Sequence, residues 1–88
     1  HQDPLLGPLR IGIIPTLSPY LMPLILKPLQ KQYPQIKLVL SEELTDTLLT
    51  RLAKHEIDAA LLATDVDDKD FESIPLFEEP FWLVHPKD

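Results

Sequence analysis

Cysteine is absent from this chain of 88 residues, and glycine occurs only twice. Without cysteine there is no disulfide framework, no thiolate nucleophile and no cysteine-ligated metal. The sequence also lacks a phosphate-binding glycine loop, a dinucleotide fingerprint and a nucleophile elbow. No apolar run approaches the roughly 20 residues that span a bilayer. We therefore expect no enzymatic activity, no cofactor, no metal site and no membrane insertion.

Basic residues are also few. Eight lysines and arginines stand against 14 acidic residues, which gives a formal charge of −6. Proteins bind DNA backbones through clustered lysine and arginine, so this chain is not expected to contact DNA itself. The acidic stretch 65–70 lacks the ligand spacing of a calcium loop, and His55 and His85 have no ligand partner at a suitable spacing. We interpret the acidic stretch as solvent-exposed and both histidines as structural.

The composition is that of one small globular domain, with 44% hydrophobic and 25% charged residues. Residues 1–8 are predicted to be a linker. Short apolar, β-branched patterns alternate with helical patterns. The predicted strands cover 9–14, 36–40, 57–63 and two extended segments within 71–86 that break at 78–80, and the predicted helices cover about 19–33 and 44–55. This order predicts an α/β fold, βαβαβ with parallel strands followed by two extended segments, with helices on the sheet faces.

Hydroxyl side chains follow each of the three predicted parallel strands. Thr16 and Ser18 follow the first strand, Thr45 the second and Thr64 the third. In an open α/β sheet, ligands bind beyond the carboxyl ends of the strands, where helix N-termini present free N–H groups. We therefore expect these four residues to gather at one edge of the sheet as an effector-binding site.

Ser18 and Thr45 have a second interpretation, as helix N-caps. Ser18 precedes Pro19, and a serine cap followed by proline at the first helical position is a common helix start. Thr45 lies at the start of the second predicted helix. For these two residues both interpretations stay open, whereas Thr16 precedes the cap and has no required backbone role.

The two predicted helices differ in their apolar surfaces. The second has one stripe, made by Leu44, Leu48, Leu49 and Leu52, which suits packing on one face of a sheet. The first is apolar around most of its circumference and contains Pro28, which should loosen its middle. It is either a well-covered core helix or a partner interface. The residues proposed for such an interface are Met22, Leu26, Leu29 and Tyr33.

Several motifs carry a family resemblance. The stretches "GPLRIG", "YPQIKL" and "LAKHEID", with a closing "HP", resemble the start of the effector-binding domain of LysR-type transcriptional regulators. The stretches "IPTLSPYLMP", "SEELTDTLL" and "PLFEEP" are most similar to the OxyR-type hydrogen-peroxide sensors within that family. Together these motifs cover nearly the whole chain.

The resemblance implies a periplasmic-binding-protein-like fold of two subdomains, of which residues 9–88 form the first, up to the hinge crossing. It implies that Thr16 and Thr45 match threonines of the peroxide pocket, and that the redox cysteines belong to the second subdomain. It further implies self-association as a dimer through helix 19–33, a cytoplasmic location, and DNA binding only through a separate N-terminal domain. Two alternatives remain: a LysR-type regulator whose small organic acid binds at Ser18, or part of a periplasmic solute-binding protein.

Overall fold

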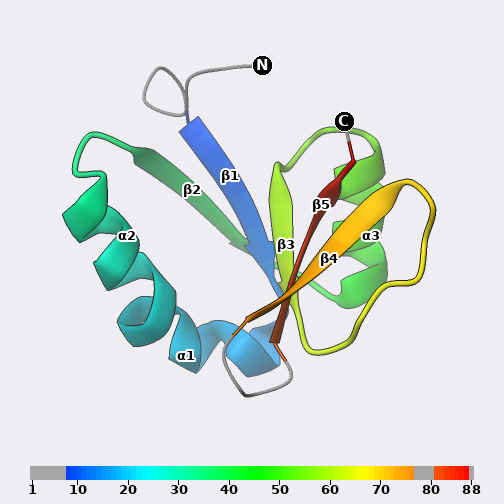
Figure 1. Ribbon diagram of the computed structural model, residues 1–88, viewed down its shortest axis with the longest axis horizontal. Helices are drawn as coiled ribbons and strands as arrows, with labels where there is room; N and C mark the ends of the chain where they lie inside the picture. Colours follow the sequence, from blue (N-terminus) through cyan, green and yellow to red (C-terminus); the bar gives the residue numbers. More distant parts are fainter. Residues whose placement is uncertain (1–7, 77–80, 88) are drawn as a thin grey trace.

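The computed structural model describes residues 8–76 and 81–87. These residues form one five-stranded sheet with the strand order β2-β1-β3-β5-β4 (Figure 1). Its strands are β1 (Pro8–Ile13), β2 (Lys37–Glu42), β3 (Ala59–Leu62), β4 (Phe71–Leu76) and β5 (Phe81–Pro86). β1 runs parallel to both β2 and β3, whereas β5 runs antiparallel to β3 and β4. The predicted α/β class, with three parallel strands followed by two extended segments, is confirmed.

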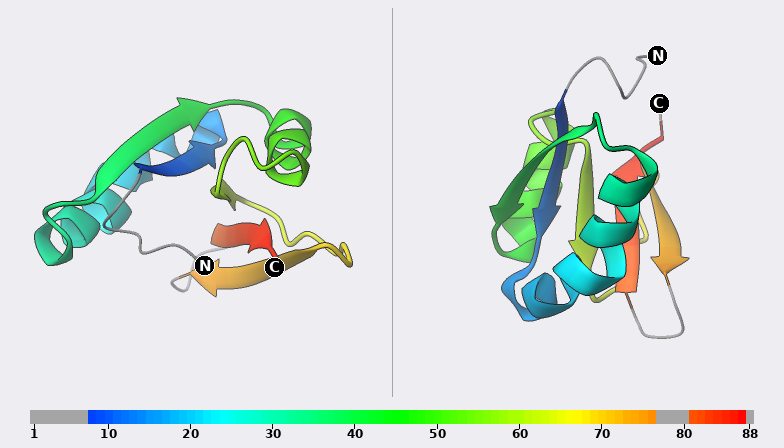
Figure 2. Two further views of the ribbon diagram at one scale, coloured as in Figure 1. Left: turned by 90° about the horizontal axis from the view of Figure 1, so that it is seen from above. Right: turned by 90° about the vertical axis from the view of Figure 1, so that its left-hand side faces the viewer.

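Helical structure lies on both faces of the sheet, and the right-hand view of Figure 2 shows the two layers on either side of it. A continuous helical run follows β1 and consists of the 3-10 turn η1 (Pro15–Leu17), α1 (Ser18–Leu21), the π turn η2 (Met22–Leu26) and α2 (Lys27–Gln32). The helix α3 (Thr45–Ala53) follows β2. The side chains of β3 separate the two cores: Leu61 packs with the helical run, whereas Ala60 and Leu62 pack with α3.

The π turn of the helical run coincides with two prolines. Pro23 lies within the turn, and Pro28 follows in the first turn of α2. Proline has no N–H to donate, and its ring clashes with the carbonyl four residues earlier, so regular α-helical bonding cannot continue unbroken through this segment. The α-helical hydrogen bonding of the run is therefore interrupted near its middle, as the presence of Pro28 led us to expect.

The start of the helical run differs from the prediction. Pro15 occupies the first helical position, where its fixed φ suits a helix, and the preceding Ile14 is extended. Ser18 already has helical φ and ψ of −53° and −42°, so its interpretation as an N-cap is wrong. The N-cap interpretation of Thr45 is also wrong, because Thr45 is the first residue of α3 and Leu44 is the N-cap.

The apolar stripe of α3 is shorter than predicted. Leu48 and Leu52 are fully buried, and Leu49 packs against the same core from a partly buried position. Leu44 is 71% exposed, because it precedes the helix in extended backbone and does not follow the helical spacing. Its assignment to the stripe is therefore corrected.

Gly12 allows α3 to lie close to β1. A Cβ atom at this position would collide with the side chain of Leu48 and would lie 3.1 Å from Cδ1 of Ile57. An added side chain would force Leu48 to shift, and interiors this dense do not absorb added volume without strain. The absence of a side chain at Gly12 thus leaves room for Leu48 of α3 against β1.

The amino edge of the sheet, where β1 and β3 begin, is joined by Arg10 and Asp58. The backbone N–H of Arg10 donates to Oδ2 of Asp58 over 2.8 Å, and the backbone N–H of Asp58 donates to the carbonyl of Arg10 over 2.8 Å. The guanidinium adds bonds to Oδ1 of Asp58 at 3.3 Å and to the carbonyl of His55 at 3.1 Å. The arginine and aspartate of the family motifs therefore have a structural role.

The first strand begins one residue earlier than predicted. Pro8, predicted to be the last linker residue, is the first residue of β1, a position at which proline costs no ladder bond; the rest of the linker, residues 1–7, lies outside the described residues. The predicted break at 78–80 also lies outside them. Within the described part of the chain, no helix has both the length and the apolar character needed to cross a membrane.

The end of α3 is a complete Schellman motif. The N–H of Glu56 donates to the carbonyl of Arg51 over 2.9 Å, and the N–H of His55 donates to the carbonyl of Leu52 over 3.0 Å. His55 has a φ of 60°, in the left-handed region that glycine occupies without steric cost.

We expect His55→Gly to stabilise the protein by about 0.5–1 kcal/mol, because relief of the left-handed strain exceeds the added flexibility of the unfolded chain. Urea unfolding measures the change. Lys54→Gly, one residue earlier at φ −90°, is the control and should destabilise. A loss of stability in His55→Gly would contradict this description of the helix end.

Candidate functional site

The carboxyl edge of the sheet, where β1, β2 and β3 end, brings together two strand-to-helix connections and the loop that follows β3 (lower part of Figure 1). Two backbone bonds hold them. The N–H of Glu43, just after β2, donates to the carbonyl of Ile13 at the end of β1 over 3.1 Å. The N–H of Ile14 donates to the carbonyl of Leu61 in β3 over 3.3 Å. The residues that follow these strands therefore start from neighbouring positions.

The four predicted effector-binding residues all follow strands that end at the carboxyl edge. Thr16 lies in η1 and is exposed, and Thr64 lies just after β3 and is also exposed. Ser18 and Thr45 begin α1 and α3, and both are half-buried. Only the hydroxyl of Ser18 makes a side-chain hydrogen bond to another described residue: it donates to the carboxylate of Glu42.

A cavity of about 400 Å³ opens at the carboxyl edge between the helical run and the end of β2. Its lining is mixed, with four apolar and three polar residues: Ile13, Ser18, Leu21, Leu26, Leu40, Ser41 and Glu42. Of the predicted effector residues, Ser18 lines this cavity and the three threonines do not. Ser41 and Glu42 were missed by sequence reasoning, although their position directly after an apolar strand pattern is the same signal that selected Thr16.

The adjacent carboxylates Glu42 and Glu43 have separate partners. Glu42 accepts the hydrogen bond from Ser18, whereas Glu43 accepts one from the guanidinium of Arg51. Successive side chains along extended backbone point to opposite faces, which directs the two carboxylates to different partners.

Arg51 is the centre of a polar network on this side of the sheet. Its Nη1 contacts Glu43 and also lies 3.4 Å from Oγ of Ser41, and its Nε lies 3.4 Å from Oε1 of Glu56. The hydrogen bond to Glu43, aided by the charges of Glu43 and Glu56, raises the pKa of the Arg51 guanidinium above its usual value. The network therefore holds a permanent positive charge between two carboxylates.

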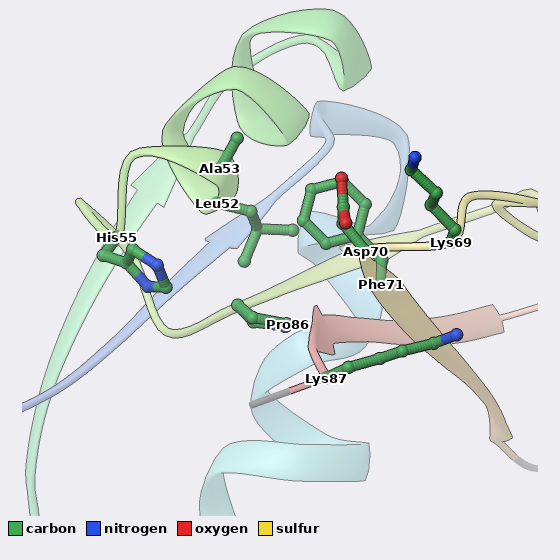
Figure 3. A pocket seen from close by; sticks show the side chains of 8 residues that line it. All are labelled: Leu52, Ala53, His55, Lys69, Asp70, Phe71, Pro86 and Lys87. Atoms are coloured by element: carbon green, nitrogen blue, oxygen red, sulfur yellow. The ribbon is translucent and has the colours of Figure 1, made fainter.

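A second cavity, of about 380 Å³, lies near the amino edge, at the other end of the sheet (Figure 3). It lies between the end of α3, the start of β4 and the end of β5. Its lining consists of Leu52, Ala53, His55, Lys69, Asp70, Phe71, Pro86 and Lys87. None of the predicted effector residues lines it, so the two cavities are distinct in position and in chemistry.

The proposed interface residues of the helical run are distributed differently from the prediction. Leu26 is 4% exposed and packs in the core beneath the run, so its assignment to an exposed interface is corrected. Leu29 is half-buried, Tyr33 is 40% exposed, and the side chain of Met22 is outside the described part. The π turn shifts the faces of the run relative to regular helical spacing, which explains why Leu26 turns inward.

This sheet topology and these motifs define the class of the protein. The family model "LysR substrate binding domain" matches residues 2–88, and the chain belongs to that family. Among curated relatives, it is 38% identical over 85 residues to the "Probable hydrogen peroxide-inducible genes activator" of Mycobacterium xenopi, covering 97% of this chain and 45% of that protein. It is 40% identical over 78 residues to the DNA-binding transcriptional dual regulator OxyR of Escherichia coli K12, covering 89% of this chain and 26% of that protein.

Solved structures agree with the relatives. The reduced OxyR regulatory domain of Pseudomonas aeruginosa matches with a TM-score of 0.77 and 35% identity, over 85% of this chain and 37% of that one. A crystal structure of the oxidized form of OxyR matches with a TM-score of 0.72 and 41% identity, over 81% of this chain and 34% of that one. The described fold is therefore that of OxyR regulatory domains, and the chain spans less than half the length of these relatives.

Proposed function

We propose that this chain is the first part of the effector-binding domain of a peroxide-responsive LysR-type transcriptional regulator. Its relatives named for hydrogen peroxide are about 40% identical over nearly all of the chain. The proposed domain organisation is a linker at 1–8 followed by the first subdomain at 9–88. The protein acts in the cytoplasm, binds DNA through a separate N-terminal domain and catalyses no reaction of its own in these residues.

The observation that carries the proposal is the contact between the two threonine-bearing connections. Thr16 lies three residues after Ile13, Thr45 lies two residues after Glu43, and Ile13 and Glu43 share a backbone hydrogen bond of 3.1 Å. A hydroxyl both donates and accepts, and hydrogen peroxide offers two donors and several acceptor lone pairs. The side chains of Thr16 and Thr45 therefore suit the binding of peroxide, with Ser18 and Thr64 at the margin of the same site.

Neither threonine has a base beside it in the sequence that would turn it into a nucleophile, so the proposed role is binding.

The organic-acid alternative has less support. The Ser18 hydroxyl that would receive the acid already donates to Glu42, and the Glu42 carboxylate would repel an anion. The solute-binding alternative has less support because the similar curated relatives are named as transcriptional activators and regulators.

Thr16→Val and Thr45→Val each keep the side-chain volume but remove the hydroxyl. We expect each to slow peroxide-driven oxidation of the full-length regulator by about 5- to 150-fold, equivalent to roughly 1–3 kcal/mol for a lost hydrogen bond. Stability should change little at these exposed and half-buried positions. Thr47→Val, on the exposed side of α3, is the matched control. Wild-type oxidation rates in both variants would show that the two threonines do not bind peroxide.

We also propose that the helical run mediates self-association of the regulator. The exposed apolar side chains of the run are Tyr20 and Leu24, and its C-cap residue Tyr33 adds a third, with exposed fractions of 52%, 40% and 40%. Val39 and Leu40 of the edge strand β2 are 45% and 42% exposed, so apolar surface occurs on two neighbouring elements. A dimer would cover such surface, which monomeric proteins rarely expose over a large area.

The self-association proposal is tested with Leu24→Glu and Tyr33→Glu in the full-length regulator. Each places a charge in the proposed interface without entering the core, unlike a change at Leu26. We expect a shift from dimer to monomer in sedimentation velocity. Ile74→Glu, at a 42% exposed residue of β4, is the control and should remain dimeric. If the Leu24 and Tyr33 variants sediment like wild type, the interface lies elsewhere.

A further inference from the structure

Arg51 holds together three segments that are separate in the sequence. Its guanidinium contacts Ser41 near the end of β2, Glu43 in the connection from β2 to α3, and Glu56 in the turn after α3. The three contacts use two different nitrogens of one planar group, so the positions of the segments are fixed relative to each other. We call Arg51, Glu43 and Glu56 the arginine clamp.

The clamp acts on the connection that carries Thr45. Glu43 is the junction: its backbone N–H is bonded to Ile13 of β1, and its carboxylate is bonded to Arg51 of α3. Thr45 is the first residue of α3, two residues after this junction. If the clamp opened, α3 could shift along its axis relative to the end of β1, and Thr45 would move relative to Thr16.

The clamp is partly shielded from water. The side chains of Arg51 and Glu43 are 30% and 29% exposed, compared with 40% for both members of the Arg10–Asp58 pair at the amino edge. The third member, Glu56, is 51% exposed, so the shielded part of the clamp is the Arg51–Glu43 pair. Charge-assisted bonds with restricted solvent access hold geometry better than fully exposed ion pairs. The Arg10–Asp58 pair is therefore a control of the same chemistry at a place remote from the proposed site.

We propose that the arginine clamp is a positioning device that sets the distance between Thr16 and Thr45 and so tunes the affinity of the site for peroxide. Arg51 does not touch the effector in this account. It acts through Thr45, and the inference rests on the proposed peroxide function. The pairing of Arg51 with Glu43 is formed within this chain and needs no second subdomain.

The test compares Arg51→Met with Arg10→Met in the full-length regulator. Methionine keeps much of the apolar stem but removes the guanidinium in both. We expect Arg51→Met to slow peroxide-driven oxidation by about threefold to tenfold, and Arg10→Met to leave the rate within about twofold of wild type. Melting temperatures of both variants are measured in parallel, because a general loss of stability would slow both proteins. Equal slowing by the two variants would overturn the proposal.

A double-mutant cycle with Thr45→Val tests the route of the effect. If Arg51 acts through Thr45, Arg51→Met should slow oxidation much less in the Thr45→Val protein than in wild type. Fully multiplicative effects would overturn the positioning role. If Arg51→Met does not fold, Glu43→Gln replaces it, because glutamine weakens the clamp but keeps a hydrogen-bond acceptor. A reduced effect in the Thr45→Val protein again supports the positioning role, and a fully multiplicative effect overturns it. If the Thr45→Val protein is oxidised at the wild-type rate, the proposed threonine site itself is refuted. If Thr45→Val is oxidised slowly but Arg51→Met at the wild-type rate, only the role of the clamp is refuted.

Discussion

The parallel placement of β1 between β2 and β3 is the constraint on which the rest of the structure depends. Because all three strands end at the same edge, each chain reversal back to the other edge must pass through a helix or a long turn. The residues that follow the strands are thereby brought to one side of the molecule. The candidate site is a consequence of this topology, and the identity of the residues in the turns decides what it binds.

The same placement buries β1 on both faces and explains the packing around it. One face meets the helical run through Ile11 and Ile13, and the other meets α3 at Gly12. The strand packs against both layers because Gly12, its next-to-last residue, has no side chain on the α3 face. The close packing of α3 on β1 therefore depends on a single glycine in the strand.

Polar contacts then fix the two edges. Arg10 and Asp58 join β1 to the start of β3 at the amino edge. Arg51 and Glu43 join α3 to the connection after β2 near the carboxyl edge. The first pair links two strands and contributes to the fold. The second links α3 to Glu43, which lies two residues before Thr45, so it bears on the candidate site.

Much of the fold could be predicted from the sequence because period-two and period-3.6 apolar patterns are local. The strands around residues 9–14 and 57–63 and the helix around Leu48 follow that rule. The start of the first helix was misplaced because one local rule is met at two positions. Ser18 was interpreted as a cap because Pro19 follows it, but Pro15 satisfies the same rule earlier in the chain.

The position of Leu26 was mispredicted because a π turn changes the periodicity on which helix faces are assigned. The contact between Glu43 and Arg51 spans eight residues and crosses the start of a helix, so helical spacing alone does not reveal it. The insertion of β5 between β3 and β4 is likewise set by the whole sheet. The candidate hydroxyls were selected because they directly follow strands, whereas no sequence pattern selected Ser41, Glu42 or Arg51, whose contacts depend on the folded structure.

The proposed effector position is the carboxyl edge of the sheet and not the cavity near the amino edge. The most direct measurement is an amide NMR titration of the full-length regulator, with its cysteines replaced by serine so that hydrogen peroxide binds without oxidising it. We expect amide shift changes concentrated at residues 14, 16–18 and 43–46. Changes confined to residues 52–55, 69–71 and 87, or no changes at any peroxide concentration that activates the wild type, would contradict this position of the site.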